Sequence, residues 1–191
     1  MSARLIIMGP QGAGKGTQAA RLAERLGVPT ISTGDMFRVH LAERTDLGQR
    51  AQRYMDAGEL VPDEITDAMV RERLAKSDAT EGFILDGYPR NAAQAKVLEG
   101  ILGESGVALN AAIELTADTD EVVQRLLKRA EEQGRSDDTE PVIRRRLAVY
   151  TEQTAPLAAL YAERDQLVQV DGVGEMDEVT DRLLAALEPK L

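Results

Sequence analysis

A glycine-rich turn between an apolar strand and a helix constrains this chain more than any other feature of its sequence. The apolar run Arg4 to Met8 is typical of a buried strand, and the turn after it reads Gly9-Pro10-Gln11-Gly12-Ala13-Gly14-Lys15-Gly16-Thr17. Glycines without a Cβ let backbone N–H groups surround phosphate oxygens, and the following helix N-terminus adds partial positive charge. Lys15 adds a full charge, and Thr17 offers a hydroxyl near a nucleotide's magnesium. The turn predicts a phosphate-binding loop.

The rest of the chain has the pattern of an α/β protein with a parallel sheet. Apolar runs bounded by glycine and proline alternate with longer stretches of helical period. A helix is expected from Lys15 to Leu26, because its apolar residues recur on one face. Five strands are expected, at Arg4–Met8, Val28–Ile31, Gly82–Asp86, Ala111–Leu115 and Leu167–Val170. We expect helices on both faces, with the phosphate loop at the carboxyl end of the first strand.

Two stretches between the expected strands depart from a simple crossover. Residues 33–76 show only short helical patterns, broken at Gly48, Gly58 and Pro62, which indicates a small helical subdomain. Asp118 followed by Glu121 predicts the start of a helix reaching about Glu132. A polar loop is expected over residues 131–140, and a long helix is expected to begin near residues 138–141.

Charge and composition exclude several classes of function. The formal net charge is −10, which disfavours nucleic-acid binding, although arginines gather locally between Arg125 and Arg146. The absence of cysteine excludes disulfides, thiol catalysis and cysteine-ligated zinc. The apolar run Leu5–Met8 is far too short to cross a bilayer, which needs about 20 residues. We therefore expect a soluble, cytoplasmic protein that binds neither nucleic acid nor membrane.

The end of the phosphate loop and three further segments carry a family resemblance. Gly16 separates Lys15 from Thr17, where most phosphate loops place the hydroxyl residue directly after lysine. The further segments are Ser-Thr-Gly-Asp-Met-Phe-Arg at residues 32–38, Gly-Phe-Ile-Leu-Asp-Gly-Tyr-Pro-Arg at residues 82–90, and Arg-Ser-Asp-Asp at residues 135–138. Together they resemble the adenylate kinase family of nucleoside monophosphate kinases, of the type with a short lid, over nearly the whole chain.

The resemblance implies where ATP and its Mg²⁺ bind. Thr17 and Asp86 would hold the Mg²⁺ of the nucleotide through water, and zinc is not expected. The residues implied to bind ATP are Gly12, Ala13, Gly14, Lys15, Gly16, Thr17, Arg129 and Gly174.

The resemblance also implies a site for AMP. Thr33 would contact the adenine and Arg38 the α-phosphate, while Gln94 offers a donor and an acceptor to a base edge. Thr33 and Gln94 are the adenine pair, where pyrimidine-nucleotide kinases tend to have Ala and Asn. The residues implied to bind AMP are Thr33, Arg38, Glu59, Leu60, Val61, Gly87, Tyr88, Pro89, Arg90, Gln94, Arg135 and Arg146.

Five cations are implied to be catalytic: Lys15, Arg90, Arg129, Arg135 and Arg146. Such a cluster suits the joining of two polyphosphates and the stabilisation of the charge on the transferred group. Arg125, Arg144 and Arg145 are instead expected on solvated helix faces, paired with nearby acids. His40 is expected on a helix surface of the AMP subdomain.

The expected organisation is a single domain over residues 1–191. Its core comprises residues 1–31, 62–128 and 140–191, its AMP-binding subdomain residues 32–61, and its short lid residues 129–139. The implied activity is ATP + AMP = 2 ADP with Mg²⁺, by a monomer. Two alternatives stay open: a UMP/CMP-type kinase, and a regulator that binds nucleotide without transfer. A GTPase would need an Asn-Lys-x-Asp motif, which neither Asn91 nor Asn110 provides.

Overall fold

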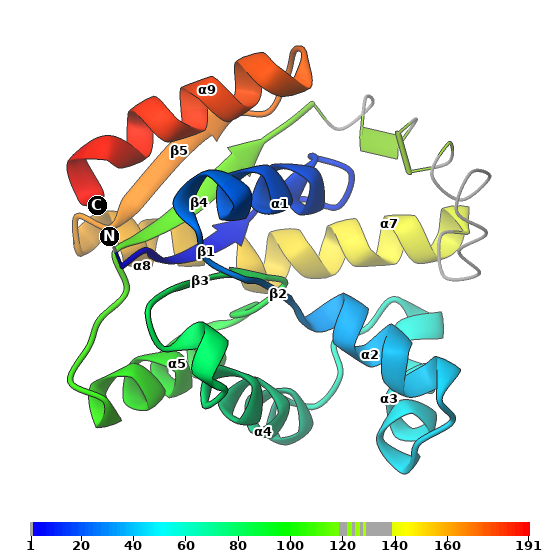
Figure 1. The fold of residues 1–191 in the computed structure, drawn as a ribbon. Coiled ribbons are helices and arrows are strands. Elements are labelled where there is room, and N and C mark those ends of the chain that lie inside the picture. The colour runs from blue at the N-terminus through cyan, green and yellow to red at the C-terminus, as the bar shows by residue number, and fades with distance from the viewer. Residues whose placement is uncertain (1, 119–121, 124, 127, 129–138) are drawn as a thin grey trace.

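The protein folds around a five-stranded sheet whose strands are all parallel (Figure 1). The computed structural model describes residues 2–118, 122–123, 125–126, 128 and 139–191. The strand order is β2-β3-β1-β4-β5. The bounds are β1 Arg4–Met8, β2 Thr30–Ser32, β3 Phe83–Asp86, β4 Ala111–Thr116 and β5 Leu167–Asp171. The five expected strands and the expected parallel arrangement are confirmed.

The second strand begins later than the sequence pattern indicated. Val28 belongs to the turn after the first helix, where Gly27 has a φ of 68° and the N–H of Val28 donates to the carbonyl of Ala23. This turn closes the helix and leaves Thr30–Ser32 to pair with β3. The expected strand Val28–Ile31 is thus corrected to Thr30–Ser32, because its apolar start caps a helix.

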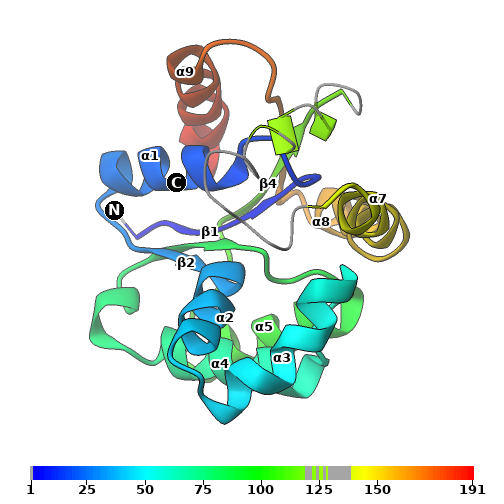
Figure 2. The same cartoon turned by 90° about the vertical axis from the view of Figure 1, so that its right-hand side faces the viewer.

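Helices cover both faces of the sheet (Figure 2). On one face, α1 Lys15–Leu26 and α9 Met176–Leu187 pack against the alternate strand residues Leu5 and Ile7. On the other face, α4 Asp63–Leu74, α5 Ala92–Glu104 and α8 Leu157–Glu163 pack against Ile6 and Met8. Because successive strand residues point to opposite faces, the apolar strands of this sheet are buried on both sides.

Two further helices, α2 Thr33–Ala42 and α3 Asp46–Ala57, follow β2 and lie beside the main sheet (Figure 1). Ser32 accepts a hydrogen bond from the N–H of Asp35 and caps α2, and Thr45 caps α3 by accepting from Gly48. Phe37 of α2 and Ala51 of α3 form an apolar cluster with Val61 and with Met69 of α4, apart from the two clusters that flank the sheet. The helical character expected between the second and third strands is therefore confirmed.

A long helical segment leads back to the sheet. It comprises α7 Glu140–Val149, a π-helical turn η2 at Tyr150–Thr154, and then α8. The helix begins within the expected residues 138–141. Residues 122–123, 125–126 and 128 are helical, as expected, and the N–H of Val122 donates to the carbonyl of Asp118.

Short 3₁₀ turns complete the chain, η1 at Ser77–Ala79 and η3 at Glu188–Lys190. Within the described residues, the structure has no helix with the length and hydrophobicity needed to span a membrane.

Candidate active site

A cavity of about 570 Å³ opens at the carboxyl ends of β1, β2 and β3. Its walls come from the phosphate loop, α2, the end of α3, the segment after β3, and α7 with its π turn. In α/β sheets of this kind, ligands bind at this edge, where the strand order reverses. Its charged lining residues are Lys15, Asp35, Arg38, Glu59, Asp86, Arg90, Arg125 and Arg146.

The phosphate loop forms one end of the cavity. Gly12 and Gly14 have φ values of 82° and 94°, which side-chain-bearing residues rarely adopt. At Gly9 a Cβ would lie 2.4 Å from the carbonyl oxygen of Leu115 in β4, so the loop passes against the strand itself. The Nζ of Lys15 donates to the carbonyl of Pro10 at 3.1 Å, which folds its charge back over the loop. The fold thus supplies a preformed cradle for phosphate.

The side chain of Asp86 ends β3 beside this loop. A Cβ on Gly16 would lie 3.8 Å from an Asp86 carboxylate oxygen, and Thr17 is the next residue on the exposed side of the loop. All three residues line the cavity. A hydroxyl and a carboxylate beside the phosphate loop suit Mg²⁺, which usually keeps most of its waters and takes few protein ligands.

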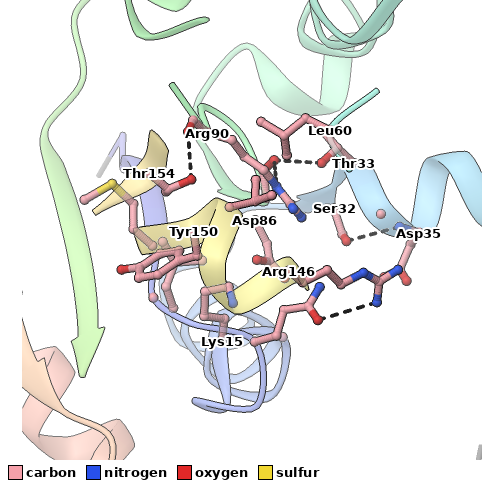
Figure 3. A pocket seen from close by; sticks show the side chains of 18 of the residues that line it. Lys15, Ser32, Thr33, Asp35, Leu60, Asp86, Arg90, Arg146, Tyr150 and Thr154 are labelled. Atoms are coloured by element: carbon pink, nitrogen blue, oxygen red, sulfur yellow. Dashed lines mark hydrogen bonds between the residues drawn. The ribbon is translucent and has the colours of Figure 1, made fainter. Parts of the chain in front are cut away.

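Arg90 lies at the centre of the cavity, held at two points of its backbone and side chain (Figure 3). Its Nε donates to the carbonyl of Gly87 at 2.9 Å, and its own carbonyl accepts a 2.7 Å hydrogen bond from Thr154 Oγ1. Burial lowers the pKa of the Arg90 guanidinium, Asp86 opposes that shift, and the charges of Arg146 and Arg38 reinforce it. Because the delocalised guanidinium of arginine keeps its proton in proteins, the group stays charged and is poised to receive an anion.

Two further arginines reach the same cavity from different helices. Arg38 of α2 pairs with Asp35 at 2.5 Å, one turn earlier on the helix. Arg146 of α7 donates to the side chain of Gln11 at 3.5 Å and to the carbonyl of Met55 at 3.3 Å. Arg146 thereby bridges the phosphate loop and the end of α3, and Figure 3 shows its guanidinium beside that loop.

Arg125 also lines the cavity, which corrects its assignment to a solvated helix face. Its Nη1 lies 3.5 Å from the carbonyl oxygen of Gly12, within the phosphate loop. Arg144 and Arg145 do behave as expected, since Arg144 pairs with Glu140 and Arg145 with Glu59. Arg125 differs from Arg144 and Arg145 because the described helical residues after Asp118 lie against the phosphate loop, where a Cβ on Gly12 would be 2.9 Å from the carbonyl oxygen of Val122.

The opposite end of the cavity combines apolar and amide groups. Leu60 and Val61 line it, and Thr33 Oγ1 donates to the carbonyl of Gly87 at 3.0 Å. Gln94 lines it with only 2% of its surface exposed. Glu59 lines the rim, and its hydrogen bond with Arg145 lowers the pKa of the Glu59 carboxyl. An apolar wall with one fixed amide suits a flat nitrogen heterocycle.

Three of the expected site residues do not line this cavity: Ala13, Tyr88 and Gly174. Ala13 is buried within the core beneath the phosphate loop. Tyr88 is 1% exposed, and its hydroxyl donates to Asp67 at 2.7 Å, so its side chain supports the segment after β3 from inside. Gly174 lies between β5 and α9, where Arg182 donates to the neighbouring carbonyl of Val173. Two further expected site residues, Arg129 and Arg135, lie outside the described residues.

Gln11, Tyr150 and Thr154 also line the cavity, and like Arg125 they were not predicted from the sequence as site residues. Tyr150 and Thr154 are the ends of the π turn, which brings both residues to the cavity wall. Burial, followed by the charge of Glu114, raises the pKa of Tyr150 to about 12, so its hydroxyl stays protonated. A π turn is frequent at functional sites but leaves no clear sequence pattern.

Comparison of the sequence with known proteins finds one matching family model and several similar proteins. A family model described as "Adenylate kinase" matches residues 7–166. An "Adenylate kinase" of Kocuria rhizophila is 60% identical over 185 residues, which cover 97% of this chain and 98% of that protein. One from a Nocardioides species is 58% identical over 185 residues, covering 97% of each chain. One from Thermobifida fusca is 54% identical over 187 residues, covering 98% of this chain and 99% of that protein.

Proposed function

The chain belongs to the adenylate kinase family, and on that premise we propose that it catalyses ATP + AMP = 2 ADP. The observation that carries the proposal is the pairing of two anion sites in one cavity. The phosphate loop with Lys15 forms the first, and Arg90 with Arg38 forms the second. A protein that only held one nucleotide would have no use for the second.

Direct transfer is the mechanism that the cavity supports. Its described lining contains neither cysteine nor histidine, and its carboxylates have other partners or places: Asp35 pairs with Arg38, Glu59 pairs with Arg145, and Asp86 lies beside the phosphate loop. Lys15, Arg90 and Arg146 instead converge on the space between the two sites, where charge spreads over the equatorial oxygens of the transferred group. Placement and electrostatic stabilisation would therefore account for most of the rate. We assign Arg129 and Arg135 to the same task from the family resemblance.

Mg²⁺ fits the donors at the phosphate loop. We propose that Thr17 and Asp86 hold it, with water completing the shell, since a hydroxyl and a carboxylate are hard oxygen ligands. When bound, the ion neutralises charge on the nucleotide phosphates. Asp86 also lies near enough to Arg90 for its charge to raise the pKa of that guanidinium.

We propose that residues 32–61 form the AMP subdomain, residues 129–139 the short lid, and the remainder the core. Met69 of α4 joins α2 and α3 in one apolar cluster, which links them to the core, and the shared cluster of Phe37 and Ala51 supports their assignment to an AMP subdomain. Its closure would exclude water and so favour transfer to AMP over hydrolysis of ATP. We further propose that the protein is a cytoplasmic monomer. The proposed location is supported by the lack of cysteine, because a chain that forms no disulfide needs no oxidising compartment.

A UMP/CMP-type kinase is the alternative acceptor specificity. Pyrimidine-nucleotide kinases tend to have Ala and Asn where this chain has Thr33 and Gln94. Because both residues line the end of the cavity assigned to the base, they argue against that alternative. A coupled assay of ADP formation, with AMP, CMP, UMP and GMP as rival acceptors, separates the two. The proposal expects magnesium-dependent turnover with a strong preference for AMP. Equal turnover of CMP would refute the base assignment, and nucleotide binding without any transfer would refute the enzyme.

A further inference from the structure

The side-chain amide of Gln94 is held from both ends at the wall of the cavity. Its Oε1 accepts a 2.8 Å hydrogen bond from the backbone N–H of Arg90. Its Nε2 donates to a carboxylate oxygen of Asp63, the first residue of α4, at 2.9 Å. Each end of the amide therefore has one fixed partner before any ligand enters.

These two partners determine which end of the amide is oxygen and which is nitrogen. A backbone N–H can only donate, and an ionised carboxylate can only accept. A reversed amide would set oxygen against the Asp63 carboxylate and NH₂ against the Arg90 N–H. The amide of Gln94 therefore has a single favourable orientation.

Asp63 is itself fixed in place although it does not line the cavity. Asn91 Nδ2 donates to both of its carboxylate oxygens, at 3.1 and 3.3 Å. Asn91 also caps α5 by accepting from the N–H of Gln94. The first turn of α4 favours a negative charge at this position. The carboxylate is thus a rigid reference point behind the base-binding amide.

The fixed amide leaves one N–H and one oxygen lone pair to offer a ligand. Adenine presents a complementary edge, with N1 as acceptor and the 6-amino group as donor. Hypoxanthine has the same shape but the reversed pattern, with N1–H as donor and O6 as acceptor. A freely rotating glutamine amide could serve either edge, whereas this one serves adenine.

We propose that Asp63 is a positioning residue that determines specificity for adenine over 6-oxopurines in the acceptor nucleotide. The proposal rests on the assignment of AMP to this end of the cavity. Asp63 acts through Gln94 and touches no substrate. Gln94 supplies the amide that contacts the base, whereas Asp63 selects the orientation of that amide.

The test compares AMP with IMP in the Asp63→Asn variant. An asparagine amide can turn to accept from Gln94 or to donate to it, so Asp63→Asn removes one of the two constraints and leaves only the Arg90 N–H to oppose the reversed orientation. We expect the ratio of kcat/KM for AMP to that for IMP to fall about tenfold, equivalent to about 1.4 kcal/mol. Glu64→Gln is the matched control, because it removes the same charge from the next, exposed residue of α4. Its ratio should stay within about twofold of the wild type.

Calorimetric binding of AMP and of IMP to each variant, without ATP, gives the same comparison independently of turnover. Wild-type turnover of AMP tests the proposed function separately. If Asp63→Asn does not fold, Asp63→Ser removes the same acceptor with less bulk and carries the same expectation. An unchanged AMP-to-IMP ratio in the Asp63 variant, or an equal fall in the Glu64 control, overturns the proposal.

Discussion

The arginine side chains of this molecule differ in the groups that they contact in the folded chain. Arg144 and Arg145 pair with the nearby acids Glu140 and Glu59, whereas Arg90 lines the cavity and donates to Gly87. Arg90 and Arg146, which the family resemblance assigned to the nucleotide sites, both line the cavity. Arg125 was misassigned because its sequence neighbours do not reveal which side of a helix faces the phosphate loop.

Replacement of Arg90 by alanine should reduce turnover far more than folding stability. We expect kcat to fall at least about 100-fold, because a buried cation aimed at the developing charge is lost. The free energy of unfolding should fall by no more than about 2 kcal/mol. Steady-state kinetics and urea unfolding measure the two effects. Arg144→Ala, which removes an exposed i,i+4 partner of Glu140, should change neither; a comparable loss of folding in Arg90→Ala would contradict its role.

Asp67, which accepts from the buried Tyr88 hydroxyl, should make stability depend on pH. Burial raises its pKa above the ordinary 3.8, partly offset by the Tyr88 hydrogen bond and reinforced by Asp63 and Glu64. The folded state then binds more protons than the unfolded state between 3.8 and the raised value. The contribution of Asp67 to stability is therefore fully present below 3.8 and is lost as pH rises through the raised pKa.

Urea unfolding of the wild type and of Asp67→Asn across this range measures that contribution. The difference in unfolding free energy, wild type minus variant, should decrease as pH rises and then level off. A difference that increases with pH would contradict the assignment. Because asparagine can still accept from Tyr88, the variant isolates the charge from the hydrogen bond.

Elements were predictable where periodicity and motif agreed, and less so where local geometry decided. The five strands and the helix after the phosphate loop follow directly from apolar patterning. The start of β2 was misplaced because Val28 is apolar yet belongs to a helix cap. The π turn at residues 150–154, where Thr154 donates to the carbonyl of Arg90, has no clear sequence pattern, and Tyr88 is buried in the core although its motif suggested nucleotide contact.

The contact between α2 and α3 gives an element-scale prediction. At Gly48 a Cβ would lie 2.3 Å from the carbonyl oxygen of His40, so Gly48→Ala must push the two helices apart. We expect KM for AMP to rise several-fold more than KM for ATP, because α2 carries Thr33 and Arg38. Gly100→Ala in α5 is the matched control, where a Cβ meets no described atom within 4 Å. It should stabilise by up to about 1 kcal/mol; equal kinetic effects of the two variants would contradict the prediction.

The whole molecule combines an acidic surface with a cationic cavity. The formal net charge is −10, yet the described cavity lining contains five arginine and lysine side chains against three carboxylates. The cations come from the phosphate loop, from α2, from the segment after β3, and from the helices that follow β4. Only the folded chain brings them together, and their convergence on one space is the basis for proposing transfer between two bound nucleotides.

Incubation of the protein with Mg²⁺ and ADP alone tests this central claim most directly. Transfer between two nucleotides in one cavity must convert two ADP into one ATP and one AMP, which ³¹P NMR can follow together with inorganic phosphate. The account predicts equal amounts of ATP and AMP, no release of inorganic phosphate, and loss of the reaction in Arg90→Ala. Release of inorganic phosphate, or the absence of any conversion by the folded protein, would contradict it.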